Sequence, residues 1–284
     1  MSTKISAIKG LEEFEFISSP AVKEAERGRP KGGLLIAINT LVYKSEIIII
    51  KENFIFVLLV EKNFKMIIGL CYCSPLADFR SFMLSLNETL TLISIKFPNV
   101  LIFVGGDFNA RVGDLNSFDQ EVTEGLENLY AKRETLDGEK KKRGAELAEC
   151  LEGHNFVLLN GRTLSDCPAQ YTFYSSNGCS VIDLVWCNLD CCEQVKDLKV
   201  EEDFIASDHF PVRVSLTNFI EKENDANETY KWTDNKKVLY QTRMQETLNF
   251  NKMKETVENA SEHLIFCLKE SANVSQMRYK GKKN

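Results

Sequence analysis

The sequence contains little proline, glycine and histidine, and these shortages exclude several classes of protein. Six prolines and 15 glycines in 284 residues are too few for a collagen-like or linker-type chain. No apolar run reaches the roughly 18 residues that a membrane span needs, because Lys51, Glu52 and Asn53 interrupt the most apolar region. The N-terminal segment MSTKISAIKGLEEF has no signal-peptide core. We therefore expect an intracellular protein, nuclear or cytoplasmic, that is neither secreted nor bound to a membrane.

The cysteines do not form a recognisable framework of disulfides or zinc ligands. Their number, nine, is odd, and no histidine lies near the clusters at 71–73 and 187–192. We expect reduced thiols that pack as small hydrophobic side chains. With 44% hydrophobic residues, the chain can bury a core, which excludes general disorder.

The net charge of −6 is unevenly distributed. Residues 219–284 carry 12 Lys and Arg against 10 Asp and Glu, which leaves 23 against 31 for residues 1–218. The excess of acidic residues in 1–218 differs from the basic face that a passive nucleic-acid-binding protein usually presents. It is compatible with carboxylates gathered around a divalent cation.

Short apolar runs alternate with helical patterns along residues 32–218. A helix is predicted at 78–97, stopped by Pro98, and a second at 143–153. The long polar stretch 113–142 shows no clear pattern. The expected strands span 34–38, 47–50, 54–60, 66–72, 100–104, 156–159, 170–174, 180–186 and 211–216. The first four are nearly continuous apolar runs, which indicates burial on both faces.

This pattern predicts an α/β fold with mixed sheets and a domain boundary near residue 218. Residues 219–237 are polar and linker-like, and residues 238–272 have a loose helical periodicity. We therefore expect one domain over 1–218, followed by a linker and helical extension over 219–284.

The segment GGDFN, 105–109, places Asp107 and Asn109 at the end of an apolar strand. Residues at alternate positions of a strand point to the same side, so both side chains are expected to face one cavity. The two glycines would allow close approach of the backbone. An Asp/Asn turn after a strand is the alternative interpretation of this segment.

A second acidic residue, Asp183, interrupts the apolar run SVIDLVW. A buried charge costs several kcal/mol unless it is paired, so Asp183 needs a partner. The segment SDHFPV offers one, since Ser207, Asp208 and His209 lie just before the last expected strand. An Asp–His pair fixes the imidazole tautomer and lets the ring act as a base or as a hydrogen-bond donor to phosphate. A capped loop is the alternative for SDHFPV taken alone.

Together these segments suggest metal-assisted attack on phosphate. Asp107, Asp183 and Asp208 supply carboxylates, and Asn109 and His209 supply an amide and an imidazole. Carboxylates hold Mg²⁺, which keeps several waters and needs only one or two protein carboxylates. The bound metal polarises phosphoryl oxygens and lowers the pKa of water.

The ordered motifs resemble the endonuclease/exonuclease/phosphatase superfamily, and most closely the endonuclease domain of LINE-type non-LTR retrotransposons and its craniofacial-development-protein-like relatives. The resemblance covers about residues 10–218. It implies an α/β fold, a four-layer sandwich of two packed mixed β-sheets flanked by helices. It also implies an enzyme that hydrolyses phosphodiester bonds with a divalent metal. The motifs that carry it are GLCYCSP (69–75), GGDFNARVG (105–113), YTFYSS (171–176), SVIDLVW (180–186) and SDHFPV (207–212).

The resemblance also implies roles for individual residues. Tyr72 would contact the scissile phosphate, and Asp107 would activate water or protonate the leaving oxygen, with Asn109 beside it. Thr172 would support the site, and Arg111 would meet the nucleic-acid backbone or remain solvated.

The remaining roles concern the second half of the site. Asp183 would orient His209, whose imidazole would bind or protonate the phosphate. Asp208, together with Asp107 and Asn109, would hold Mg²⁺, or alternatively Mn²⁺, and Ser207 belongs to the same turn.

The sequence departs from the family pattern at its N-terminus. In the family, a strand with an Asn and a strand with a metal-binding Glu come first, and the matching region begins just after that Glu. We therefore expect an N-terminally incomplete domain whose first strands are missing. The segment after 218 resembles the linker before a reverse transcriptase.

The predicted function is that of a Mg-dependent DNA endonuclease of retrotransposon origin, with activity impaired by the lost Glu strand. The alternatives are a catalytically inactive descendant that acts as a binding protein and a phosphatase of the same superfamily. DNA is the expected partner, and no obligate protein partner is predicted.

Overall fold

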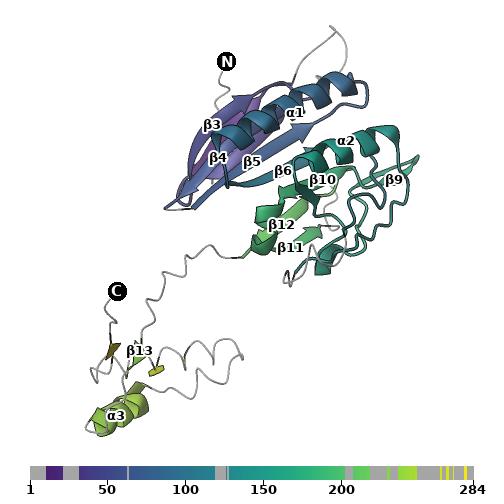
Figure 1. Cartoon of the computed structure of the whole chain (residues 1–284). Coiled ribbons are helices and arrows are strands. Elements are labelled where there is room, and N and C mark those ends of the chain that lie inside the picture. The colour runs from purple at the N-terminus through teal and green to yellow at the C-terminus, as the bar shows by residue number, and fades with distance from the viewer. Residues whose placement is uncertain are drawn as a thin grey trace. The chain divides into compact units, whose positions relative to one another are not determined.

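The computed structural model describes residues 11–21, 32–62, 64–118, 126, 128–201, 207–217, 229–230, 236–247, 263, 267–268, 271 and 278–279. The chain forms two compact units, Met1–Thr217 and Asn218–Asn284. Figure 1 shows the elements of each unit along the chain.

The first unit is built on a six-stranded mixed sheet. Strands β5 and β6 run parallel, and every other neighbouring pair runs antiparallel. The order across the sheet is β3 (Lys44–Ile50), β4 (Phe54–Glu61), β5 (Phe64–Tyr72), β6 (Leu101–Asp107), β10 (Asp183–Asn188) and β7 (Phe156–Leu158).

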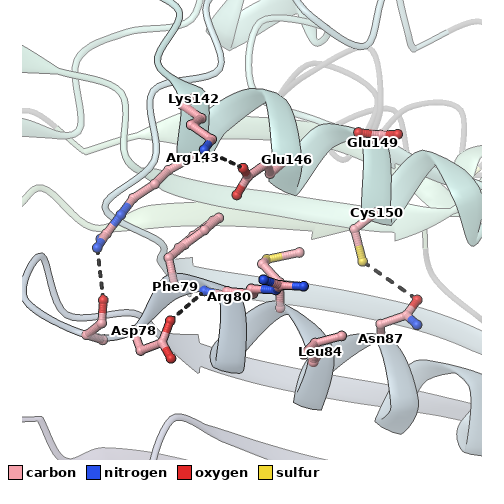
Figure 2. Close-up of a pocket in the computed structure, with 12 residues that line it drawn as sticks. Asp78, Phe79, Arg80, Leu84, Asn87, Lys142, Arg143, Glu146, Glu149 and Cys150 are labelled. Atoms are coloured by element: carbon pink, nitrogen blue, oxygen red, sulfur yellow. Dashed lines mark hydrogen bonds and ion pairs between the residues drawn. The ribbon is translucent and has the colours of Figure 1, made fainter.

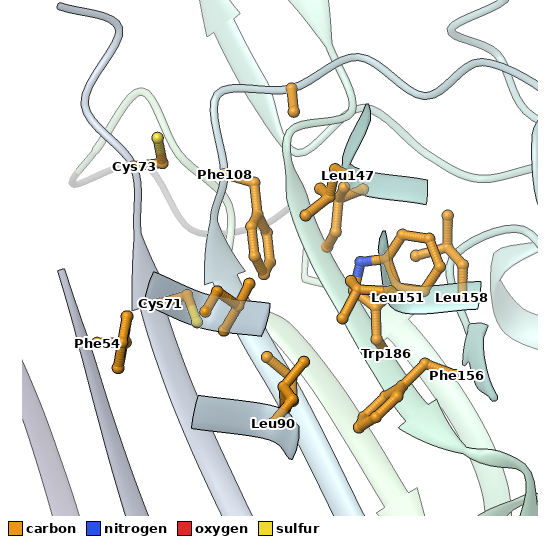
Figure 3. Packing of buried hydrophobic residues seen from close by; sticks show 14 of the residues in the cluster. Phe54, Cys71, Cys73, Leu90, Phe108, Leu147, Leu151, Phe156, Leu158 and Trp186 are labelled. Atoms are coloured by element: carbon orange, nitrogen blue, oxygen red, sulfur yellow. The ribbon is translucent and has the colours of Figure 1, made fainter. Parts of the chain in front are cut away.

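Two helices, α1 (Phe79–Lys96) and α2 (Lys142–Gly153), cover one face of this sheet (Figure 1). Helix α1 begins where the Asp78 carboxylate accepts hydrogen bonds from the backbone N–H groups of Arg80 and Ser81, at 3.1 and 3.4 Å. The apolar stripe of each helix packs on the sheet around the fully buried Trp186 (Figure 3). This layer holds the largest part of the core.

The opposite face of the sheet carries two separate antiparallel pairs. The pair of β1 (Phe14–Ser19) and β2 (Leu34–Asn39) packs on β4 and β5, whereas the pair of β11 (Val195–Val200) and β12 (Val212–Leu216) packs on β6, β7 and β10. The α/β class with mixed sheets is confirmed. The described residues form three layers, and beyond these they contain the short 3₁₀ helices η2 (Leu164–Asp166) and η3 (Leu189–Gln194).

Several boundaries differ from the sequence prediction. The run 180–186 is not one strand, because β9 (Gly178–Ser180) pairs with β8 (Phe173–Ser175), and β10 starts anew at Asp183. Asp183 is therefore the first residue of β10 and does not interrupt an apolar strand. The runs 34–38 and 47–50 are not buried on both faces either, since β2 exposes Leu35 and Ala37 and β3 is an edge strand.

In the second unit, the structure describes helix α3 (Lys237–Thr247) and the two-residue pair of β13 (Thr229–Tyr230) and β14 (Arg278–Tyr279). Most of the helical periodicity predicted over 238–272 lies outside the described residues. No helix in the described ranges is long and apolar enough to cross a membrane.

Candidate active site

Three predicted site residues lie in one row across the centre of the sheet. Tyr72 ends β5 and is paired with Asp107 at the end of β6, and Asp107 is paired in turn with Asp183 at the start of β10. Directly opposite residues on neighbouring strands project to the same face of a sheet. That face is the one that carries β1–β2, because Tyr72 packs with the apolar cluster under these strands. The row therefore lies on the side away from the helices.

Gly106 makes the close approach between β5 and β6 possible just before this row. Its φ is +142°, and a Cβ atom there would lie 1.9 Å from the carbonyl oxygen of Cys71. Gly105 has no such requirement, since its Cβ would meet nothing closer than 3.6 Å. Of the two glycines, Gly106 alone requires the freedom that the sequence analysis assigned to both.

Asn109 holds the carboxylate of Asp107. Its backbone N–H donates to one carboxylate oxygen at 2.9 Å, and its side-chain amide lies 2.8 Å from both oxygens. Burial, and next the negative charge of Asp183, raise the pKa of Asp107 to about 6. The carboxylate of Asp107 is therefore a stronger base than that of a solvated aspartate.

Asp183 and His209 form the pair that the sequence analysis expected. The imidazole Nδ1 lies 2.9 Å from one carboxylate oxygen and 3.1 Å from the other. The hydrogen bond to Asp183 is the main cause that raises the pKa of His209 above its usual value. The ring of Phe173 packs against the imidazole with 4.7 Å between ring centroids, which helps to fix its orientation.

Thr172 joins the two halves of the site from a fully buried position. Its hydroxyl oxygen accepts hydrogen bonds from the N–H groups of Ile182 and Asp183, at 3.1 and 3.0 Å. Its carbonyl accepts one from the N–H of Phe210, the residue after His209. Thr172 thus ties the start of β10 to the segment that carries the imidazole.

Ser207 and Asp208 lie in the exposed turn before His209. The hydroxyl of Ser207 accepts a hydrogen bond from the N–H of His209 at 3.1 Å, and it lies 3.4 Å from the Asp208 carboxylate. The carbonyl of Asp208 accepts from Tyr174. The Asp208 carboxylate is near enough to contribute to the raised pKa of His209.

Arg111 is engaged by two carboxylates. Its guanidinium donates to Asp137, with Nε at 2.9 and 3.1 Å from the two oxygens, and it also pairs with Glu139. Asp137 is buried, and it accepts a further hydrogen bond from Val181 just before β10. Within the structure, Arg111 thus anchors the loop that supports the site; a contact with nucleic acid stays a prediction.

Asn160 also supports the site, although it belongs to none of the motifs singled out in the sequence. The fully buried amide donates to the carbonyl of Asp183 at 3.2 Å and accepts from the N–H of Val185 at 2.9 Å. The available signal was its position directly after the apolar run FVLL, which parallels the place of Asp107 after its own strand.

A family model described as endonuclease-reverse transcriptase matches residues 66–213, more than half of the chain. The chain belongs to the endonuclease-reverse transcriptase family. The match includes Tyr72, Asp107, Asp183 and His209, and it confirms the resemblance to the endonuclease/exonuclease/phosphatase superfamily. No curated protein matches the sequence significantly.

Solved structures with a similar fold include three nucleases. The AP endonuclease LMAP from Leishmania major is 14% identical with a TM-score of 0.51, over 72% of this chain and 70% of that one. The endonuclease domain of TRAS1, a telomere-specific non-LTR retrotransposon, is 17% identical with a TM-score of 0.48, over 69% and 76%. The 3′-5′ exonuclease NExo from Neisseria meningitidis is 14% identical with a TM-score of 0.46, over 72% and 80%. LMAP supports the fold of this endonuclease-reverse transcriptase family member.

The site of this family member offers oxygen donors of the kind that a hard divalent cation prefers. Asp107 and Asp183 lie close enough for their charges to interact, and that repulsion contributes to the raised pKa of Asp107. A cation between or beside them would relieve it. In the described part of the chain, no three His, Cys, Asp or Glu side chains are arranged to hold a metal ion.

A groove of about 840 Å³ lies elsewhere on the protein, between α1 and α2 (Figure 2). Phe79, Leu84, Asn87, Arg143 and Cys150 are among its lining residues. Arg143 crosses one end of it and donates to the carbonyl groups of Ser74, Pro75 and Ala77. Because the helices cover the other face of the sheet, this groove is separate from the row of site residues.

Proposed function

We propose that this chain is a Mg²⁺-dependent endonuclease of retrotransposon origin that hydrolyses phosphodiester bonds in DNA. The observation that carries the proposal is the Asp183–His209 pair, with 2.9 Å between Nδ1 and the carboxylate, in one row with Asp107. Membership of the endonuclease-reverse transcriptase family supports the same reaction class.

His209 would act on the phosphate. Asp183 engages Nδ1, so Nε2 is the nitrogen available to a substrate, and the tautomer is fixed by the pair. The raised pKa of His209 favours the imidazolium, which can donate a hydrogen bond to a phosphate oxygen and later transfer a proton. Tyr72 would contact the same phosphate from the neighbouring strand.

Asp107 would carry out the other proton transfer of the reaction, from the attacking water or to the leaving oxygen. Since the pKa is raised to about 6, both protonation states are populated near neutral pH. The carboxylate form can take a proton from the attacking water, and the neutral form can give one to the leaving oxygen. The hydrogen bonds from Asn109 keep the group in place during either transfer.

Asn109, Asp208 and Asp107 in its ionised form would hold the metal. Mg²⁺ usually binds through one or two protein carboxylates and keeps several waters, so a cluster of three acidic side chains is not required. When bound, the ion polarises the phosphoryl oxygens and lowers the pKa of a bound water.

Nicking of supercoiled plasmid by the full chain tests the proposal, with Mg²⁺ or with EDTA. We expect Mg²⁺-dependent nicking that falls by about 10²- to 10⁴-fold in Asp183→Asn and in His209→Ala. Asp190→Asn is the matched control, because Asp190 is an exposed acid beyond the opposite end of β10. In Asp183→Asn, NMR titration should also show a lower pKa for His209, because the hydrogen bond to the Asp183 carboxylate is the main cause that raises it.

A folded chain that binds DNA without cutting it would contradict the endonuclease proposal and favour a binding protein of the same family. Release of phosphate from a 3′-phosphorylated oligonucleotide, without nicking, would favour a phosphatase. Equal losses in Asp183→Asn and Asp190→Asn would show that the assay reports stability instead of the site.

A further inference from the structure

Three side chains with atoms that can bind a metal meet where the end of α2 faces α1. The Oδ1 atom of Asn87 on α1 lies 2.8 Å from Nε2 of His154 and 3.9 Å from Sγ of Cys150. Cys150 lies in the last turn of α2 and His154 follows its end, so the two are one turn apart and project from the same side. Figure 2 shows the thiol of Cys150 directed towards Asn87, at the groove between the two helices. A thiol, an imidazole and an amide oxygen thus converge on one point.

We propose that Cys150, His154 and Asn87 form a binding site for Zn²⁺. Zn²⁺ prefers thiolate and imidazole ligands and is usually held by four ligands in tetrahedral geometry. Cys150 and His154 supply these two ligands, and the amide oxygen of Asn87 takes the place that a carboxylate oxygen has in other zinc sites. The fourth position is left to a water molecule.

The spacing of the three atoms agrees with that of a tetrahedral zinc site. Bonds of about 2.3 Å to sulfur, about 2.05 Å to nitrogen and about 2.1 Å to oxygen place the oxygen about 3.4 Å from the nitrogen and about 3.6 Å from the sulfur. The observed separations are 2.8 and 3.9 Å. Asn87 is exposed, and Cys150 and His154 are partly exposed, so small side-chain rotations close these differences and an ion can enter from the solvent.

The charges around the three side chains favour a cation. Burial lowers the pKa of His154 and so favours the neutral imidazole, which is the form that binds a metal. Burial, and next the negative charge of Glu149, raise the pKa of the Cys150 thiol. A cation at the thiol offsets both effects, because a thiol that coordinates a metal loses its proton. The proton passes to the solvent as the bond between sulfur and zinc forms.

The zinc site is separate from the candidate active site. Helices α1 and α2 cover one face of the sheet, whereas the row of Tyr72, Asp107 and Asp183 lies on the other. Mg²⁺ selects oxygen ligands, and Zn²⁺ accepts sulfur and nitrogen, so the two sites favour different ions. The proposal therefore does not rest on the proposed function, and each can fail without the other.

Titration of the reduced full chain with Co²⁺, a spectroscopic substitute for Zn²⁺, tests the site in the presence of excess Mg²⁺. We expect one equivalent of Co²⁺ to give the near-ultraviolet charge-transfer band of a cobalt–thiolate bond, and Zn²⁺ to displace it. Cys150→Ser should abolish this band and weaken Zn²⁺ binding by more than about tenfold, because even the loss of a residue that only supports a metal ligand costs about 10- to 100-fold.

Asn87→Asp tests the third ligand by a gain of affinity. The carboxylate has the shape of the amide and adds a negative charge, so it should strengthen Zn²⁺ binding about tenfold. An asparagine that only forms hydrogen bonds with its two neighbours would give no such gain, and an unchanged affinity would overturn the assignment of Asn87 as a ligand.

Cys267→Ser is the matched control. Cys267 belongs to another cysteine–histidine pair, in the second unit, with 3.6 Å between its Sγ and Nε2 of His263, but it is fully buried. The cobalt–thiolate band should therefore persist in Cys267→Ser. A wild-type chain without this band, or a band that is lost in Cys267→Ser and kept in Cys150→Ser, would overturn the proposal.

Thermal unfolding gives a second measurement of the same site. An ion that binds only the folded chain stabilises it, so Zn²⁺ should raise the thermal midpoint of the wild type and of Cys267→Ser. It should not raise the midpoint of Cys150→Ser. An equal rise in all three chains would contradict the proposed site.

Discussion

At the scale of single residues, the chain buries several ionisable groups away from the candidate active site. Asp166 is the clearest: it is fully buried and accepts hydrogen bonds from the N–H groups of Gly161 and Gln170, at 3.0 and 2.9 Å. Burial is the main cause that raises the pKa of Asp166 to about 7. The folded chain thus holds this proton more tightly than the unfolded chain, where the pKa is about 3.9.

Asp166 should make the folded state less stable as the pH rises. Its protonated form stabilises the fold fully below about pH 4, and this contribution is lost as the pH rises towards about 7. Relative to Asp166→Asn, which does not titrate, the free energy of unfolding of the wild-type chain should fall by about 1 kcal/mol per pH unit between about pH 5 and 7. Urea unfolding of both chains measures this slope. Parallel pH dependences would contradict it.

How far single residues could be predicted depends on how unusual their surroundings look in the sequence. Asp183 was conspicuous because an acid in an apolar run needs a partner, and the pair with His209 is present. Asn160 and Asp137 contact the site through backbone groups that are distant in sequence, at Val185 and Val181. Asp137 lies in the polar stretch 113–142, where the sequence gives no sign of such a contact, whereas for Asn160 the one available signal was its position directly after FVLL.

At the scale of elements, the approach of β5 to β6 depends on one glycine, Gly106. Gly106→Ala should lower the free energy of unfolding by about 3 kcal/mol or more, since a Cβ would lie 1.9 Å from the Cys71 carbonyl and the φ of +142° is unfavourable for alanine. Gly105→Ala is the matched control, with about 1 kcal/mol or less, because its Cβ meets no atom within 3.6 Å. Urea unfolding compares the two, and similar losses would show that the close approach is not limiting.

The elements that the sequence predicted well are the buried ones. Strand β4 and helix α1 have continuous or periodic apolar residues because they pack inside the first unit. Strands β1 and β11 were missed, since each covers one face of the sheet and alternates buried with exposed residues over only six positions. The break between β9 and β10 was also missed, because Val181 and Ile182 are buried although they belong to no strand.

At the scale of the whole molecule, the three apolar clusters found among the described residues belong to the first unit. All three of its hydrophobic clusters are built from residues that precede Thr217, the last of them being Leu216 of β12. The first compact unit is Met1–Thr217. The domain boundary near 218 stays a prediction from the sequence, which rests on the change from apolar runs to polar sequence at that point.

We therefore expect a chain that ends at Thr217 to fold by itself. Its thermal midpoint should lie within about 2 °C of the corresponding transition of the full chain, because no residue of the three clusters has been removed. A chain that ends at Val200 is the informative control: it lacks Val212, Val214 and Leu216, the residues of β12 that pack against the second apolar cluster, and it also lacks His209. Scanning calorimetry of the three chains decides the point. If the chain ending at Thr217 were unfolded while the full chain was folded, residues 218–284 would have to supply stability that the clusters do not contain.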